Sequence, residues 1–158
     1  MALHPSPDDG VRIAGLMPVI SITRLRVRRW WYLPQFFLAA LRTAKQAAAA
    51  DGSVHAALLR DAHRTFWTAT SWRDDAAMKA FMHAAPHGPI MRKLLDWCDE
   101  ASLVHWTQDA ADLPEWPEAH RRLMSQGRPS KVKHPTDAHK SLTFPAPTAS
   151  ATAHTRLK

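Results

Sequence analysis

The sequence has little of several features that define common protein classes. It contains one cysteine, Cys98, among 158 residues. A single cysteine cannot form an internal disulfide or a multi-cysteine zinc site, so the cysteine content gives no sign of an oxidising compartment. A glycine-rich dinucleotide fingerprint is also missing, which leaves no support for a bound flavin or nicotinamide.

Long unbroken apolar runs are missing as well. The most apolar stretch, residues 33–50, is interrupted by Arg42 and Lys45, and charges inside a run argue against a membrane-spanning helix. Asp8 and Asp9 interrupt any signal-peptide pattern at the start of the sequence. We therefore expect a cytoplasmic protein.

Acidic residues are scarce relative to basic ones, with 14 Asp and Glu against 21 Lys and Arg, a formal net charge of +7. Residues 128–158 hold six of the cations and only Asp137 as an anion, so this segment supplies +5 of the total. It contains one Phe and two Leu, too little apolar surface to offset the entropy of ordering. We expect a basic disordered tail with weak attraction to membranes and no specific nucleic-acid partner.

The rest of the chain has the composition of one globular domain, with 46% hydrophobic residues and seven Trp. We place this domain at residues 16–127, after a flexible arm at residues 1–15. Strand patterns occupy residues 16–28, 54–61, 64–72 and 101–106. Helix patterns occupy residues 33–50, a segment capped by Asp74 or Asp75, a segment that begins at Pro89, and residues 114–124.

The order of these elements, strand-helix-strand followed by strand-helix-strand, predicts an α+β fold with a ferredoxin-like βαββαβ sheet and helices on one face. Cover for the other face must come from elsewhere, and a second copy is the simplest source. We therefore expect a homodimer. By parity Phe66, Thr68, Thr70 and Trp72 share one face, and one of the two faces of this strand should meet the helices and any pocket.

Two histidines are candidate catalytic groups. His87 lies between Pro86 and Gly88 just before a helix start, where the positive end of the helix favours a neutral imidazole that can act as a base or a ligand. His105 lies on the last strand and could face the pocket or cross a dimer interface. A surface or capping role remains the alternative for His87. His83 and His87 together do not indicate a metal site, because no Asp, Glu or Cys lies at a ligand spacing from them. We therefore expect no metal.

Acidic residues gather around Cys98, which we place on the apolar face of a helix as an inert thiol. Asp96, Asp99 and Glu100 would lie at the end of that helix, either as a solvated acidic end or with Asp96 orienting His87 or His105 as a base.

Aromatic side chains supply large flat apolar surfaces. They are either plain core or the walls of a pocket for an aromatic, polyene or haem ligand. The candidate wall residues are Phe66, Trp67, Trp72, Phe81, Trp97 and Trp106.

A group of basic residues is followed directly by three aromatic residues near residue 30. Arg24, Arg26, Arg28 and Arg29 precede Trp30-Trp31-Tyr32. This segment is either a solvated strand edge or a weak contact with an anionic membrane surface.

The middle of the chain also resembles a known family, the spheroidene monooxygenase-like bacterial proteins, over roughly two-thirds of its length. The resemblance is carried by Phe66-Trp67-Thr68, Trp72-Arg73-Asp74, Ala77-Met78, Phe81, His87, Met91, Leu94, residues 96–101 and His105-Trp106. It implies the dimeric α+β barrel of the antibiotic biosynthesis monooxygenases, in which each subunit keeps a pocket between sheet and helices.

Three functions follow as hypotheses. The first is a monooxygenase-like enzyme that acts on a hydrophobic small molecule, either without a cofactor or with haem held by His87 or His105. The second is a non-catalytic protein that binds a small ligand, haem included, in the same pocket. The third is an interaction module in which the basic tail makes the contact.

Overall fold

The computed structural model describes residues 17–148 and 154–158. The arm expected at residues 1–15 lies outside the described residues. Six strands form one sheet in the order β5-β4-β1-β3-β2-β6. Their bounds are β1 Val19–Val27, β2 Ser53–Asp61, β3 Thr65–Trp72, β4 Cys98–Thr107, β5 Arg128–Pro129 and β6 His154–Arg156.

The four long strands have the ferredoxin-like order β4-β1-β3-β2, and each neighbouring pair is antiparallel. A turn of three residues joins β2 to β3, with His63 and Arg64 in the left-handed region at φ of 58° and 61°. This short connection allows no crossover, so β2 and β3 must be antiparallel neighbours. The predicted α+β fold is confirmed.

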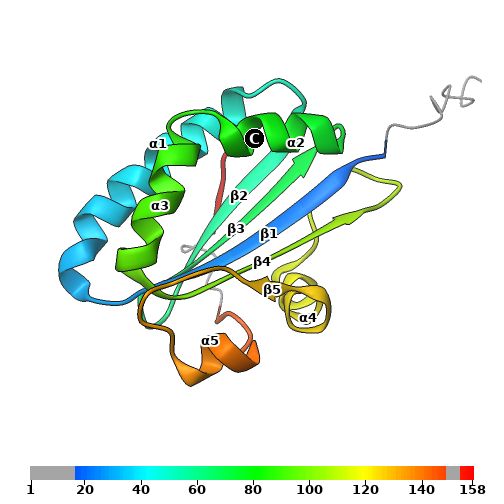
Figure 1. Ribbon diagram of the computed structural model, residues 1–158. Coiled ribbons are helices and arrows are strands. Elements are labelled where there is room, and N and C mark those ends of the chain that lie inside the picture. Colours follow the sequence, from blue (N-terminus) through cyan, green and yellow to red (C-terminus); the bar gives the residue numbers. More distant parts are fainter. Residues whose placement is uncertain (1–16, 149–153) are drawn as a thin grey trace, which may run out of the picture.

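Three helices cover one face of the sheet: α1 Leu33–Ala49, α2 Asp75–His83 and α3 His87–Trp97. They lie together above the strands in Figure 1. Asp74 caps α2, because its side chain accepts a hydrogen bond from the Ala77 backbone N–H at 2.8 Å. Among the described residues, no helix combines the length and the apolarity needed to cross a membrane.

Both ends of α3 differ from those predicted. Helix α3 begins at His87, two residues before Pro89, and ends at Trp97, so Cys98 opens β4 instead of lying on a helix. Asp99 and Glu100 are therefore strand residues and not a helix end. Residues 98–100 contain no Gly or Pro that would mark the end of the helix, which explains why the predicted helix extended past Trp97.

The opposite face of the sheet is covered by the same chain. Helices α4 Trp116–Gln126 and α5 Asp137–Ser141 lie below the strands in Figure 1. Side chains of Ile20, Ile22 and Trp67 pack there in one buried cluster with Leu123 of α4 and with Phe144. The face that we expected a second copy to cover is thus occupied from within.

The expected disordered tail is wrong for the described part of residues 128–158. Arg128–Pro129 pairs with β4, and His154–Arg156 pairs with β2. His139 and Phe144 are buried. The tail has few apolar residues of its own, but the sheet supplies the rest of the apolar surface, so the tail does not need a core of its own.

A buried ionic network ties this tail to the sheet. Arg24 Nη1 lies 2.6 Å from Glu100 Oε2, and Thr136 donates a hydrogen bond to Glu100 Oε1 at 2.8 Å. The Arg24 guanidinium also lies over the Phe144 ring, 4.2 Å from its centroid. Burial raises the pKa of Glu100, but the hydrogen bonds from Arg24 and Thr136 outweigh burial and bring the pKa below its ordinary 4.5.

Candidate functional site

A cavity of about 170 Å³ lies between the sheet and helices α1, α2 and α3. An engineered cavity of about 150 Å³ in another protein binds benzene. The cavity therefore has room for a ligand built around one or two small rings. Its lining is mostly apolar and includes Phe36, Ala40, Ala44, Met78, Met91 and Leu94.

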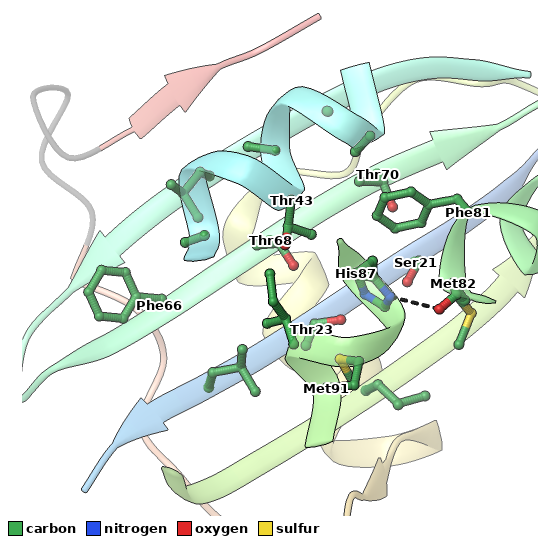
Figure 2. Close-up of a pocket in the computed structure, with 18 of the residues that line it drawn as sticks. Ser21, Thr23, Thr43, Phe66, Thr68, Thr70, Phe81, Met82, His87 and Met91 are labelled. Atoms are coloured by element: carbon green, nitrogen blue, oxygen red, sulfur yellow. Dashed lines mark hydrogen bonds between the residues drawn. The ribbon is translucent and has the colours of Figure 1, made fainter. Parts of the chain in front are cut away.

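The strand floor of the cavity carries a row of hydroxyl groups. Ser21 and Thr23 of β1 lie beside Thr68 and Thr70 of β3 (Figure 2). Thr70 Oγ1 accepts a hydrogen bond from Trp72 Nε1 at 2.9 Å. These groups give an otherwise apolar cavity a few fixed polar contacts, as in other small-molecule sites.

Thr43 adds a hydroxyl from the helix side. Its Oγ1 is buried and has no hydrogen-bond partner in the described part of the chain. A buried hydroxyl without a partner carries a desolvation cost that a bound ligand with a polar atom would remove.

His87 forms part of the wall between the helices and the floor (Figure 2). Its backbone N–H donates to Gln46 Oε1 at 2.8 Å. Its ring Nδ1 lies 3.0 Å from the Met82 carbonyl oxygen. A carbonyl oxygen only accepts, so Nδ1 carries the proton and Nε2 keeps a free lone pair.

Burial keeps this imidazole neutral. Burial lowers the pKa of His87 below its ordinary 6.5, the nearby His83 lowers it slightly further, and the hydrogen bond to Met82 opposes both. A neutral imidazole with one fixed N–H and one free nitrogen is a usable general base at neutral pH.

His105 lines the same cavity from β4. Burial, together with the charge of Arg128, lowers its pKa below 6.5, while Asp75 opposes the shift. The structure thus brings both predicted histidines to one cavity, and both imidazoles are neutral near pH 7.

Three of the expected wall aromatics line the cavity: Phe66, Trp72 and Phe81. The rings of Trp72 and Phe81 stack with centroids 4.9 Å apart, and the Phe81 and His87 rings lie 4.6 Å apart. These contacts fix the orientation of His87 from one side.

Trp67, Trp97 and Trp106 do not line the cavity, contrary to expectation. Trp67 has the opposite strand parity, so it packs in the cluster below the sheet and donates to Asp61 Oδ2 at 3.3 Å. Trp106 also faces away and donates to Gln108 Oε1 at 2.8 Å. Trp97 closes α3, with Lys93 Nζ 5.8 Å from its ring centroid.

Asp96 does not join His87 or His105 as an orienting carboxylate. It is exposed and pairs with Lys133 at 2.7 Å. Cys98 is fully buried, and burial raises the pKa of its thiol to about 12, so the thiolate does not form near neutral pH. The described residues contain no group of three or more His, Cys, Asp or Glu placed to hold a metal ion.

The sequence placed Thr68 and Thr70 on one strand face with Phe66 and Trp72, but it did not single out Ser21, Thr23 or Thr43 or indicate that the hydroxyl groups form a row. A signal was present, because Thr68 and Thr70 share strand parity with Phe66 and Trp72, and Thr43 shares a helix face with Phe36 and Ala47. Placing them in one cavity needed the pairing of β1 with β3 and the position of α1 over both.

Comparison with known proteins shows the family to which the chain belongs and the fold that it shares with solved structures. A family model described as a domain of unknown function, DUF3291, matches residues 37–154. No curated protein matches the sequence.

Several solved structures share the architecture. A Nitrosomonas europaea protein proposed to be an antibiotic biosynthesis monooxygenase is 16% identical, with a TM-score of 0.53 over 59% of this chain and 91% of its own. A Bacteroides thetaiotaomicron protein described as a possible oxidoreductase is 12% identical, with a TM-score of 0.52 over 58% and 98% of the two chains. A mutant of SnoaB, a cofactor-independent oxygenase from Streptomyces nogalater, is 22% identical, with a TM-score of 0.49 over 62% and 98%. The first two likenesses show a shared ferredoxin-like α+β fold.

Proposed function

This chain belongs to the DUF3291 family, and we propose that it is a monooxygenase-like enzyme that oxidises a hydrophobic small molecule in the cavity between the sheet and α1–α3. The observation that carries the proposal is His87, a neutral imidazole with a fixed tautomer in an apolar cavity of about 170 Å³. The oxidoreductase descriptions of two structural neighbours support the same kind of chemistry. The narrower likeness to spheroidene monooxygenase-like proteins is part of the proposal.

The proposed reaction needs a base and a dry cavity. The free Nε2 of His87 removes a proton from an electron-rich phenol, and the resulting anion transfers one electron to O₂. Recombination forms a carbon–oxygen bond and gives a peroxide anion, which takes a proton from the imidazolium to become a hydroperoxide. Loss of the ring proton at that carbon then breaks the O–O bond and releases water.

The balance can be written for a simple probe, 1-naphthol. One 1-naphthol and one O₂ give one 1,4-naphthoquinone and one water. The ring loses four electrons, and the two oxygen atoms gain four. No further reductant is needed, so the step can run without a cofactor.

The haem version of the hypothesis fits the site poorly. A cavity of about 170 Å³ compares with one that holds benzene, whereas haem carries four pyrrole rings. His87 or His105 could present a nitrogen to iron, but the space between them and the helices would have to widen. We therefore propose the cofactor-free version.

A second candidate is a non-catalytic protein that binds a small ligand in the same cavity. The observation in its favour is that Asp96, which we expected to orient a histidine, pairs with Lys133 instead. No carboxylate therefore contacts His87 or His105 among the described hydrogen bonds, and such a partner often strengthens a histidine base.

For either function we propose that the protein is located in the cytoplasm.

Oxygen uptake with 1-naphthol tests the proposal. We expect the purified full chain to consume O₂ and to form 1,4-naphthoquinone in equal amounts. An absorption spectrum of the same preparation shows whether a haem band is present. Saturable binding without oxygen uptake would favour the non-catalytic candidate, and a haem band would contradict the cofactor-free version.

A further inference from the structure

Most of the large apolar side chains that are exposed in the described part of the chain lie close together in the sequence. Seven such side chains are exposed among the described residues, and five of them fall within residues 30–41. We call these five the α1 patch: Trp30, Trp31, Phe37, Leu38 and Leu41. The solvent-exposed fraction is 70% for Trp30, 51% for Leu38 and 47% for Phe37. Isolated exposed apolar residues need no explanation, but a cluster of this kind does.

Phe37, Leu38 and Leu41 lie on the outer face of α1, and Trp30 and Trp31 lie in the 3-10 turn Trp30–Tyr32 that leads into it. The inner face of α1 is already used. Phe36, Ala40, Thr43 and Ala47 of α1 point to the cavity. Positions 37, 38 and 41 fall on the other side of the helix at 3.6 residues per turn. Burial within the described chain therefore does not account for them.

The charges around the patch are of one sign. Residues 28–50 contain Arg28, Arg29, Arg42 and Lys45 and no Asp or Glu. The Arg29 guanidinium lies 5.7 Å from the Trp31 ring centroid. Asp51, one residue beyond this segment, is paired with Arg73, and Asp96 at the end of α3 is paired with Lys133.

We propose that the α1 patch is a docking surface for an anionic membrane. Trp and Arg are the residues that settle at a membrane interface, the rings in the headgroup layer and the cations beside the phosphates. A second copy of the chain fits less well. A symmetric contact would bring two patches of the same charge together with no carboxylate between them.

This proposal stands on exposure and charge and does not depend on the proposed oxidation. It has a consequence for the cavity, because α1 would carry lipid on one side and the cavity lining on the other. The residues that face the membrane and the residues that line the cavity would then lie on opposite faces of one helix.

Vesicle sedimentation tests the proposal with the full chain. The two vesicle types are phosphatidylcholine alone and phosphatidylcholine with phosphatidylglycerol at a molar ratio of seven to three. We expect binding to the anionic vesicles only, and binding should weaken as salt rises. Trp30→Ala with Trp31→Ala should weaken it roughly tenfold. Arg42→Gln with Lys45→Gln should weaken it roughly 10- to 30-fold, since each cation near the surface contributes about fivefold.

Matched controls separate the patch from general stickiness and from general charge. Met124→Ala removes an exposed apolar side chain elsewhere on the molecule. Arg60→Gln with Lys140→Gln removes two exposed cations, one of them in the basic tail. Both controls should bind as the unchanged protein does. All changed side chains are exposed, and circular dichroism checks that each variant folds.

Three results would overturn the proposal. The first is equal binding, or no binding, to the two kinds of vesicle. The second is anionic binding that the patch variants leave unchanged, which would assign the attraction to the tail. The third is a dimer that Phe37→Asp with Leu41→Asp dissociates, which would make the patch a contact between copies. Quenching of Trp30 and Trp31 fluorescence by brominated lipid, lost in Trp30→Phe with Trp31→Phe, would support it.

Discussion

His87 shows how local packing can prepare one side chain for chemistry. The hydrogen bond from its ring Nδ1–H to the Met82 carbonyl oxygen fixes the tautomer. The Phe81 ring lies against the imidazole, and burial keeps the imidazole neutral. None of these contacts involves a charged partner. The free nitrogen is thus available to a ligand in the cavity, and its protonation state changes only in acid.

Replacing His87 tests its role as a base. We expect His87→Gln to lower kcat/KM for 1-naphthol oxidation by roughly 10²- to 10⁴-fold, the usual contribution of a general base. His83→Ala, an exposed histidine four residues away, is the matched control and should keep full activity. Activity of His87→Gln equal to that of the control would remove the assignment, and His105 would be examined next by the same comparison.

The pH dependence follows from the lowered pKa of His87. The unfolded chain binds the proton at about pH 6.5, whereas the folded chain binds it only at lower pH. Below pH 6.5 the unfolded state therefore holds more protons, so stability falls as the pH drops towards the folded-state pKa. The acid limb of kcat/KM should also lie below pH 6.5. A limb above pH 6.5 would show that another group titrates.

For the strand aromatics, parity decides which of the proposed wall residues reach the cavity. Phe66 and Trp72 share a parity and reach the cavity, whereas Trp67 has the other parity and cannot. Trp67 and Trp106 were proposed as wall residues because their rings are large and apolar, without regard to the face on which they lie. Asp96 was misplaced because its partner Lys133 comes from a segment expected to have no structure.

At the scale of elements, the C-terminal segment takes the place of a second sheet. Leu123 of α4 and Phe144 beyond α5 bury the face that carries Ile20, Ile22 and Trp67. The sequence indicated a helix at residues 114–124 but not the sheet face against which this helix packs. A count of apolar residues in the tail alone could not reveal the apolar surface that the sheet offers to it.

Phe144→Ala measures how firmly this segment is held. Removing a buried ring leaves a cavity and costs the apolar contacts, so we expect a loss of about 3–5 kcal/mol in the free energy of unfolding. Urea denaturation followed by circular dichroism gives the value. Thr143→Ala, an exposed neighbour, should change it by less than about 0.5 kcal/mol. Equal small losses for both would mean that the segment does not pack on the sheet.

The Arg24–Glu100 pair gives a second prediction for the same contact. Glu100 also pairs with Arg26, and it is the carboxylate that contacts Arg24. Removing that carboxylate leaves the buried Arg24 guanidinium without its partner, so Glu100→Leu alone should cost about 3–5 kcal/mol in the free energy of unfolding. Arg24→Met with Glu100→Leu should recover most of this loss. The pKa of Glu100 is lowered, so its contribution is present above pH 4.5 and disappears as the pH falls through the folded value. A double variant as unstable as the single one would contradict this account.

At the scale of the whole molecule, the covered sheet face bears on assembly. The homodimer expected from the sequence rested on that face being free and on the resemblance to a dimeric barrel family. The first ground is lost, because α4 and Phe144 occupy the face. A homodimer stays a prediction, but its interface would have to lie elsewhere. The fold itself followed from the order of strands and helices, because short turns and antiparallel pairing leave few topologies.

Truncation after residue 127 tests the cover directly. The shortened chain should expose Trp67 and its neighbours, and we expect it to self-associate or aggregate in sedimentation velocity runs. The full chain under the same conditions is the comparison. A truncated chain with the sedimentation and stability of the full one would show that residues 128–158 cover nothing.

The cavity between the sheet and α1–α3 is the centre of this account, and a titration with 1-naphthol tests it most directly. Ala44→Leu adds side-chain volume to the cavity lining, and Ala49→Leu adds the same volume at an exposed position of the same helix. We predict saturable one-to-one binding to the unchanged protein and to Ala49→Leu, and at least a roughly tenfold weaker affinity for Ala44→Leu. Equal affinity for both variants, or no saturable binding to the unchanged protein, would contradict it.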